Sequence, residues 1–302
     1  MSQPEHLSLQ RVDLLPPGEA DVVVHVEWSG ISTGTEKLLW LGKMPNFPGM
    51  GYPLVPGYES VGRIIEAGPD SGQVIGKRVF IPGSRGFRDV RGLFGGAAQR
   101  LITPGARVIP VEESLGDKAI LLALAATAYH AIAGHPPELI IGHGVLGRLL
   151  ARITIAMGHP APNVWELSAE RAEGAEGYAV LTPESDTRRD YARICDASGD
   201  SNILDQLVSR LRAGGEITLA GFYDRLSFAF APAFMREVTM RIAAEWQAQD
   251  MAGLNALIAG GRLSLDGLIT HRQAAEDAPD AYRTAFGDAR CLKMVLDWRQ
   301  QG

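Results

Sequence analysis

The sequence has 302 residues, of which 46% are apolar and 21% charged, and its formal net charge is -6. This is the composition of an ordinary globular protein with enough chain for two domains. The negative charge and the lack of a basic stripe argue against a nucleic-acid partner, because neutralising phosphates needs clustered Lys and Arg. The two cysteines, Cys195 and Cys291, lie too far apart to build a cysteine-rich metal site.

We expect no targeting segment and no membrane span. Residues 1–6 contain no basic stretch followed by an apolar run, so a signal peptide is not expected. The longest apolar stretch, residues 119–133, is too short for a membrane span, and Thr127 and His130 interrupt it. A reduced cytoplasmic enzyme is the plain inference.

The first 115 or so residues predict short strands separated by turns. β-Branched and alternating residues favour the strands, with Gly and Pro between them. The expected strands are residues 21–27, 60–66, 76–82 and 98–103. Strands at this spacing suggest a small barrel or a distorted sandwich.

From Ser114 onwards the pattern changes to alternating helices and strands, with Ser114 as the expected cap of a helix over residues 117–133. Strands are predicted at residues 139–141, 163–166, 178–181, 192–196, 216–220 and 238–244, and helices at 145–157, 168–173, 202–212 and 249–259. This alternation predicts a parallel, doubly wound sheet with right-handed crossovers. The last predicted strand, residues 291–297, is expected to return to the N-terminal β domain.

A glycine turn between a predicted strand and a predicted helix is the most informative motif. It reads Gly142-His143-Gly144-Val145-Leu146-Gly147. Gly142 allows the tight turn, Gly144 lets backbone N–H groups approach a pyrophosphate, and Gly147 lets the helix and strand pack closely. The helix N-terminus then favours the phosphates. The backbone N–H of His143 is expected to matter more than its ring.

Glu166, at the end of the next predicted strand, completes a dinucleotide site. A carboxylate there would accept hydrogen bonds from both ribose hydroxyls of NAD and repel the extra phosphate of NADP. Arg171 could instead accommodate that phosphate, but we expect it to contribute to helix packing or adenine stacking. The motif therefore predicts NAD as cofactor.

The order of these parts resembles the medium-chain dehydrogenase/reductase superfamily. Similar segments occur at residues 53–62, 76–79, 196–199, 214–222 and 268–272, and together they cover nearly the whole chain. The resemblance implies an α/β protein with an N-terminal GroES-like β-rich domain, residues 1–116 and 263–302. A doubly wound parallel Rossmann sheet, residues 117–262, would bind the dinucleotide, with Ala197 and Gly221 beside it. It also suggests a homodimer joined near residues 238–244.

Within the superfamily, one branch is especially similar. Residues 29–36, Ser-Gly-Ile-Ser-Thr-Gly-Thr-Glu, together with Gly57-Tyr58-Glu59 and the short chain, resemble the hydroxyethyl bacteriochlorophyllide a dehydrogenases of bacteriochlorophyll biosynthesis. That resemblance implies NAD-dependent oxidation of the C3 1-hydroxyethyl group of a chlorin-type pigment to an acetyl group.

The sequence departs from the zinc enzymes of the superfamily. These hold their catalytic metal with a cysteine, a histidine–glutamate pair and a further cysteine or acid. Here the first cysteine position is Ser32, the histidine position is Tyr58, and the four-cysteine lobe of the structural zinc is missing. A hydroxyl and a phenol are poor zinc ligands. We predict no zinc.

Without zinc, side chains or water must take the proton of the alcohol. The candidates are Ser32, Thr35, Glu36, Tyr58 and Glu59. Tyr58 is the first choice, because a phenol can both donate to and accept from an alkoxide-like oxygen. Glu59 has a structural alternative, in which it pairs with a neighbouring Arg or Lys.

Residues 28–52 are rich in aromatic side chains and Met, which suit a planar macrocycle through stacking and thioether contacts. The candidate substrate contacts are Trp40, Met44, Phe47 and Tyr52, because Gly and Pro break this part into a loop. The alternative, that some of these side chains fill the core of the β domain, is equally open.

Two other functions remain open. A zinc-free quinone or enone reductase of the same superfamily would usually prefer NADPH, and Glu166 counts against it. A protein without chemistry, acting as an NAD-dependent sensor or as a pigment carrier, would keep the glycine turn but would need none of the polar residues around Tyr58.

Overall fold

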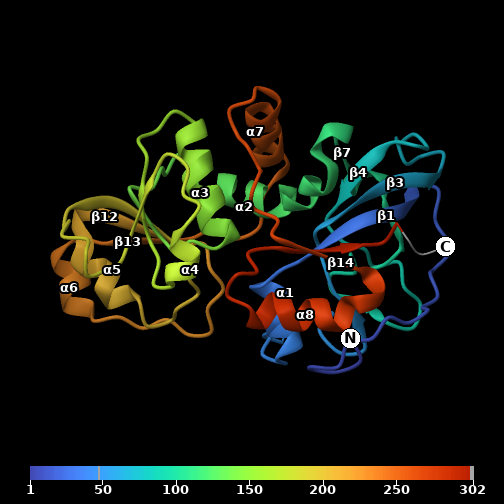
Figure 1. Cartoon of the computed structure of the whole chain (residues 1–302), viewed down its shortest axis with the longest axis horizontal. Coiled ribbons are helices and arrows are strands. Elements are labelled where there is room, and N and C mark those ends of the chain that lie inside the picture. The colour runs from blue at the N-terminus through green and yellow to red at the C-terminus, as the bar shows by residue number, and fades with distance from the viewer. Residues whose placement is uncertain (47, 300–302) are drawn as a thin grey trace. The chain divides into compact units, whose positions relative to one another are not determined.

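The computed structural model describes residues 1–46 and 48–299, which fold into two compact units (Figure 1). The first unit is formed by Met1–Ala123 together with the segment that begins at Asp266, and the second by Leu124–Leu265. Each unit has its own sheet and its own buried apolar core.

The first unit is built around a mostly antiparallel sheet with the strand order β14-β15-β1-β3-β4-β7, and β6 also pairs with β1. Alternate residues of β1, Val22, Val24 and Val26, are fully buried, as expected for one face of a strand. Its strands are β1 (Asp21–Ile31), β2 (Leu54–Val55), β3 (Ser60–Ala67), β4 (Arg78–Ile81), β5 (Arg91–Gly92), β6 (Arg100–Pro104), β7 (Ile109–Pro110), β14 (His271–Ala274) and β15 (Met294–Asp297).

The return of the C-terminal strand to the β domain is confirmed. β15 runs antiparallel to β1, with Trp28 opposite Asp297 and Ile31 opposite Met294. The helices of this unit are short: α1 (Thr35–Trp40), η1 (Gly105–Arg107), η2 (Glu113–Leu121), η3 (Ala275–Asp277) and α8 (Ala278–Gly287). A short connection, residues 32–34, joins β1 to α1. The end of the long central strand and the first turn of α1 therefore lie close together.

The helix predicted over residues 117–133 is wrong in its first part. Glu113–Leu121 forms the 3-10 helix η2, and the α-helix α2 spans Leu122–Ile132. Gly116, with φ 52° and ψ -139°, interrupts η2, and Ser114 lies inside η2 instead of capping a helix. The combined stretch Glu113–Ile132 is long and apolar enough to cross a membrane, but 56% of its apolar window is buried in the protein. A core helix passes the same test, so this is weak evidence for a span.

The second unit contains a parallel sheet with the strand order β10-β9-β8-β11-β12-β13 (Figure 1). This order confirms the predicted doubly wound sheet, whose direction of winding reverses between β8 and β11. Its strands are β8 (Leu139–Ile141), β9 (Asn163–Trp165), β10 (Ala179–Leu181), β11 (Tyr191–Asp196), β12 (Leu211–Leu219) and β13 (Thr239–Ile242). Its helices besides α2 are α3 (Val145–Ala156), α4 (Ala169–Ala172), α5 (Leu204–Arg210), α6 (Phe230–Met235) and α7 (Ala248–Ala259).

The predicted helix over residues 202–212 is shorter in the structure. α5 ends at Arg210, and β12 begins at Leu211, which pairs with Tyr191 before the register shifts. Gly214, with φ 67°, lies in that irregular part of the strand. Gly214 and Gly215, which follow the predicted helix, therefore lie within an irregular strand.

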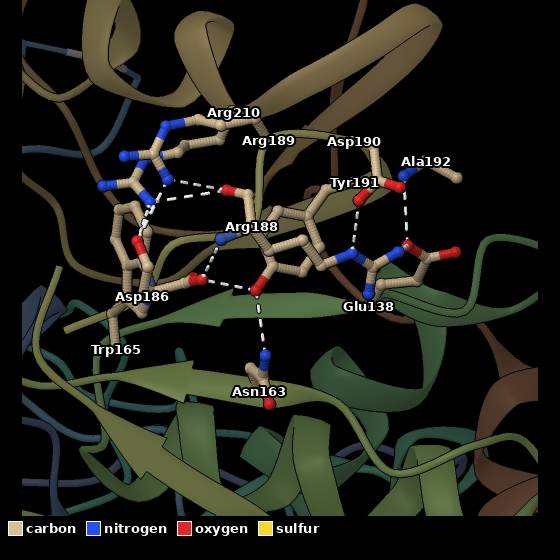
Figure 2. Close-up of polar contacts among 10 residues, drawn as sticks. All are labelled: Glu138, Asn163, Trp165, Asp186, Arg188, Arg189, Asp190, Tyr191, Ala192 and Arg210. Carbon is tan, nitrogen blue, oxygen red and sulfur yellow. Dashed lines mark hydrogen bonds and ion pairs between the residues drawn. The ribbon is translucent and has the colours of Figure 1, made fainter.

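The connection between β10 and β11 is a loop in place of a crossover helix (Figure 2). Its centre is Asp186, whose carboxylate accepts hydrogen bonds from Trp165 Nε1 and the Tyr191 hydroxyl, both at 2.8 Å. Burial alone would raise the pKa of Asp186, but the hydrogen bonds from Tyr191, from the Arg188 N–H and from Trp165 lower it. The guanidinium of Arg210 donates to the carbonyls of Asp186 and Pro183 and lies over the Trp165 ring.

Buried carbonyl groups need hydrogen-bond donors, and in a helix the backbone supplies them. In this loop the side chain of Arg210 supplies them to Asp186 and Pro183. Arg188 adds an ion pair with Glu138, immediately before β8, and lies over the Tyr191 ring (Figure 2).

Candidate active site

The glycine turn follows β8 and leads into α3. Gly142 adopts φ 92°, in the left-handed region that favours glycine, and its N–H donates to the Trp165 carbonyl at 2.8 Å. A Cβ at Gly147 would lie 1.8 Å from the Gly142 carbonyl oxygen, so a side chain there would force helix and strand apart. A Cβ at Gly144 would meet no protein atom within 4 Å. Gly144 therefore faces open space, as an approach route for a pyrophosphate requires.

Val145 and Leu146 begin α3 directly after this open position. The first N–H groups of a helix have no partner inside the helix, and they carry the positive end of its dipole. The turn thus combines unpaired donors with an absence of side-chain bulk, and this combination fits an anionic phosphate group.

The carboxylate of Glu166 is already held by three backbone N–H groups. Oε1 accepts from Leu167 at 2.8 Å and from Ser168 at 2.9 Å, and Oε2 accepts from His143 at 3.0 Å. A carboxylate has about four acceptor positions, so about one remains for a ribose hydroxyl. Glu166 is therefore fixed beside the glycine turn before any ligand binds.

The prediction that the His143 backbone matters more than its ring is incomplete. The side chain is fully buried, with Nδ1 at 2.6 Å from the Arg171 carbonyl and Nε2 at 2.7 Å from the Tyr178 hydroxyl. A buried ring with two hydrogen-bond partners fixes the segment that carries them. Arg171 contacts His143 and Arg148 with its backbone carbonyl group.

Arg148 was missed by sequence reasoning. From the first turns of α3 its guanidinium donates to four carbonyls, at distances of 2.7 to 3.1 Å; these belong to His143, Arg171, Glu173 and Gly174. Its position on a helix face of mostly apolar, buried residues was the signal that could have identified it, because a buried arginine needs partners. It holds the loop after α4 against the start of α3.

Ala197 and Gly221 lie at the carboxyl ends of β11 and β12, as predicted positions beside the cofactor require. The Ala197 N–H donates to the Ile141 carbonyl at 3.0 Å. A Cβ at Gly221 would lie 2.7 Å from the Tyr223 hydroxyl, which donates to the carboxylate of Asp196 at 2.8 Å. Burial raises the pKa of Asp196 despite this hydrogen bond. Ligands of doubly wound sheets bind at this edge, next to the point where the winding reverses.

In the first unit, the structure brings Ser32, Thr35 and Tyr58 together. The Tyr58 hydroxyl lies 2.7 Å from Ser32 Oγ and 3.5 Å from Thr35 Oγ1. Burial, and then the negative charge of Glu59, raise the pKa of Tyr58 above its usual range. Tyr58 is therefore a neutral phenol that offers one donor and acceptor positions.

Glu59 forms an ion pair with Lys293, and both side chains are buried. The Lys293 ammonium also donates to the Ile31 carbonyl at 3.2 Å. The sequence left two roles open for Glu59, as a catalytic group or as the partner of a neighbouring Arg or Lys. The structure shows the second, the pairing with Lys293. Sequence reasoning did not identify Lys293 as a partner. The available signal was its position just before an apolar strand, next to Met294 and Val295, where a lysine is unusual.

Glu36 is a second buried carboxyl group in this cluster. It accepts hydrogen bonds from the Tyr282 hydroxyl and, at 3.0 Å, from the Ser32 N–H. Burial raises the pKa of Glu36 to about 7, although the hydrogen bond from Tyr282 acts in the opposite direction. This carboxyl group consequently changes its protonation state near neutral pH.

Three of the predicted substrate contacts pack in or against the core of the first unit: Met44, Trp40 and Tyr52. Met44 is only 8% exposed and lies in the core cluster, and Trp40 packs against Tyr282 and Phe286. Tyr52 packs against the same core and donates to the Leu39 carbonyl. Met44 is thus part of the packed core, and its role as a substrate contact stays a prediction. Phe47 lies outside the described residues.

A cavity of about 800 Å³ does occur in the first unit. Its walls include Val55, Arg100, Tyr282 and Trp298. Among the residues described by the structure, its lining does not include Trp40 or Tyr52.

The residues at the zinc positions do not fit a zinc ion. Ser32 and Tyr58 supply hydroxyl oxygens in place of thiolate and imidazole, and the carboxylate of Glu59 is paired with Lys293. Within residues 1–46 and 48–299, no group of three or more His, Cys, Asp or Glu is arranged to hold a metal ion.

Comparison with known proteins places these features in a family. Residues 18–113 match the family model of the alcohol dehydrogenase GroES-like domain. The chain is 57% identical to the 2-desacetyl-2-hydroxyethyl bacteriochlorophyllide A dehydrogenase of Rhodobacter capsulatus and 56% identical to that of Cereibacter sphaeroides. Each alignment covers 99% of this chain and 97% of the relative.

Solved structures share the fold at low identity. The 2R,3R-butanediol dehydrogenase of Bacillus subtilis has a TM-score of 0.85 and 17% identity, with 98% of each chain covered. A short chain alcohol dehydrogenase from Escherichia coli, complexed with NADH, has a TM-score of 0.83 and 21% identity, with 98% of this chain and 97% of the other covered. The chain belongs to the family of 2-desacetyl-2-hydroxyethyl bacteriochlorophyllide A dehydrogenases, oxidoreductases of the medium-chain dehydrogenase superfamily that act on a CH–OH group.

Proposed function

We propose that the protein oxidises the C3 1-hydroxyethyl group of a bacteriochlorophyllide to the 3-acetyl group, with NAD as hydride acceptor and without zinc. The names of the two relatives support the substrate. The observation that carries the zinc-free chemistry is the 2.7 Å contact between the Tyr58 hydroxyl and Ser32 Oγ beside the paired Glu59. In this proposal the first unit binds the pigment and the second unit binds the dinucleotide.

The second unit supports a nicotinamide dinucleotide through its glycine turn. Gly144 and the first N–H groups of α3 would hold the pyrophosphate, and Glu166 would bind the adenosine ribose. A carboxylate at that position repels a 2′-phosphate, which favours NAD over NADP. When bound, NAD supplies the acceptor for the hydride that leaves the alcohol carbon.

The polar cluster of the first unit supplies the groups for the hydroxyl. Tyr58 is a neutral phenol, so it acts by hydrogen bonding to the alcohol oxygen and not as a phenolate base. Ser32, which contacts the same hydroxyl, orients it. The proton that leaves the alcohol together with the hydride passes along these hydroxyls to water. Thr35, at 3.5 Å, makes a weaker contact with Tyr58 and contributes to its orientation.

The test is conversion of a 3-hydroxyethyl bacteriochlorophyllide by the purified protein, followed by the red shift of its absorption band. We expect turnover with NAD, little with NADP, and no loss after dialysis against a chelator. Tyr58→Phe should lower kcat about 100-fold, the lower end of the range for a lost acid–base group. Tyr191→Phe is the matched control, because it also removes a buried hydroxyl, from the Asp186 network.

Full turnover by the Tyr58→Phe protein would remove the assigned role of Tyr58. Strict use of NADPH, with reduction of a quinone or enone and no oxidation of the pigment, would replace the proposed function by a reductase. Binding of pigment and NAD without any turnover would leave a sensor or carrier.

We also propose that the protein is a homodimer joined through β13. This strand lies at the edge of its sheet, and large apolar residues on it and on α6 are exposed: Ile242 is 77% exposed and Met235 75%. Phe230 and Phe234, stacked on each other, are 71% and 65% exposed. An exposed sheet edge with an apolar patch is suited to a self-complementary twofold interface.

We place the enzyme in the cytoplasm. Cys195 is a free and buried thiol, which agrees with a reducing compartment.

A further inference from the structure

His143 ties the glycine turn to the segment that follows Glu166. Its backbone N–H donates to Glu166 Oε2 at 3.0 Å. Its ring lies between the Arg171 carbonyl, 2.6 Å from Nδ1, and the Tyr178 hydroxyl, 2.7 Å from Nε2. Arg171 belongs to α4 and Tyr178 immediately precedes β10. A single buried residue therefore fixes both ends of the segment over residues 167–178.

The partners of the ring determine its tautomer. A carbonyl oxygen only accepts hydrogen bonds, so Nδ1 carries the hydrogen and donates to Arg171. Nε2 is then an acceptor, and the Tyr178 hydroxyl donates to it. Burial lowers the pKa of His143, which agrees with a neutral ring. The Tyr178 ring packs edge-on against the imidazole, with a centroid distance of 5.5 Å.

Arg148, in the first turn of α3, also ties the glycine turn to the segment after Glu166. It donates to the carbonyl of His143 itself and to three carbonyls of the segment, those of Arg171, Glu173 and Gly174. α4 has only four residues, so these side-chain contacts hold a segment that has little regular structure of its own.

We propose that His143 is a positioning residue for coenzyme selection, which holds Glu166 and residues 167–178 in the arrangement that accepts the ribose of NAD and excludes the 2′-phosphate of NADP. The inference rests on the proposed function, because it takes NAD as the coenzyme. Accommodating a phosphate would require the Glu166 carboxylate to withdraw or a cation such as Arg171 to approach. Either change requires residues 167–178 to move away from His143.

The variants His143→Ala and His143→Asn separate this role from simple folding. Alanine keeps the backbone N–H to Glu166 but removes both ring contacts. Asparagine places an amide nitrogen close to the Nδ1 position, so that the hydrogen bond to the Arg171 carbonyl is retained. Binding of NADH and of NADPH is titrated by cofactor fluorescence, with no pigment present, and thermal unfolding is recorded for each variant.

We expect His143→Ala to reduce the preference for NADH over NADPH about tenfold, the effect of one buried hydrogen bond. His143→Asn should restore most of the preference. His135→Ala is the matched control, because it removes a different imidazole of the same unit, one that is partly buried and contacts Glu216. It should lower stability without changing the ratio of dissociation constants.

An unchanged ratio in His143→Ala, or equal weakening of both coenzymes, would overturn the role of His143. A wild-type protein that binds NADPH as tightly as NADH would contradict the assignment of NAD together with this inference. Because no pigment is used, a failure of the proposed oxidation would be seen separately in the turnover assay.

Discussion

Lys293 and Glu59 form an ion pair in which both side chains are buried, with 2% and 0% of their surfaces exposed. The pair lies beside Tyr58, whose pKa is raised by burial and by the charge of Glu59. Lys293 thus compensates a carboxylate that would otherwise lie unpaired next to the candidate catalytic hydroxyl. Removing one partner of such a pair leaves a buried charge, which is far more destabilising than losing the pair as a whole.

Lys293→Met should therefore lower the free energy of unfolding by about 3–5 kcal/mol. The double variant Lys293→Met with Glu59→Gln should recover a large part of this loss, because no uncompensated charge remains. Urea denaturation of the two single variants and the double variant gives the coupling energy directly. A coupling energy near zero would show that the two side chains do not stabilise each other.

Glu36 should make stability fall as the pH rises towards neutrality. Its pKa is raised from 4.5 to about 7 in the folded protein, so between these values the unfolded chain releases a proton that the folded protein retains. The stabilising contribution is present below pH 4.5 and is lost as the pH rises through 7. From pH 5.5 to 8 the loss is about 2 kcal/mol, at about 1.4 kcal/mol for each pH unit up to 7.

The comparison with Glu36→Gln isolates this effect, because a neutral amide does not titrate. The difference in unfolding free energy between the variant and the parent should change by about 2 kcal/mol between pH 5.5 and 8, in favour of the variant at the higher pH. A difference that is the same at both pH values would show that Glu36 ionises normally.

The two glycines of the turn should respond differently to alanine. Gly144→Ala should fold normally, because its Cβ meets no protein atom within 4 Å, but should bind NAD at least tenfold more weakly. Gly147→Ala should destabilise the unit itself, because its Cβ would lie 1.8 Å from the Gly142 carbonyl oxygen. Thermal unfolding and NADH titration of both variants make the distinction. Tight NADH binding by Gly144→Ala would place the pyrophosphate elsewhere.

Ile242→Glu should convert the proposed dimer into a monomer. The side chain is 77% exposed on the edge strand β13, so a charge there should leave the isolated fold intact while repelling a second copy. Light scattering coupled to size-exclusion chromatography measures the mass of both proteins. Val74→Glu, at an apolar residue of the first unit that is 65% exposed, is the control and should keep the parental mass. A parental protein that already runs as a monomer contradicts the proposal.

Several features were predicted correctly because they depend on short stretches of chain. β8 spans Leu139–Ile141 as expected, and the glycine turn and α3 follow it. The parallel, doubly wound sheet was predicted from the alternation of strands and helices. The predicted helix over residues 117–133 was wrong in its first part, because the same local pattern is compatible with an α-helix and with a 3-10 helix. The apolar stretch after Glu113 became a 3-10 helix broken at Gly116 before α2 began.

The roles of individual side chains were less predictable. Trp40, Met44 and Tyr52 have a composition that suits either a ligand or a core, and packing against residues such as Tyr282 determined the outcome. His143 was judged by its backbone alone, because its ring partners, Arg171 and Tyr178, lie on a later segment whose position the motif does not define.

The sequence by itself determined the dinucleotide fold and the turn that would carry the phosphates, because strand, glycine turn and helix are encoded by neighbouring residues. Only the tertiary structure decided which buried charges meet. Glu59 pairs with Lys293 because β15 returns to β1, and Ser32 meets Tyr58 because β1 also pairs with β3. Such contacts join residues far apart in the chain, and their stability depends on burial that exists only after the sheet has formed.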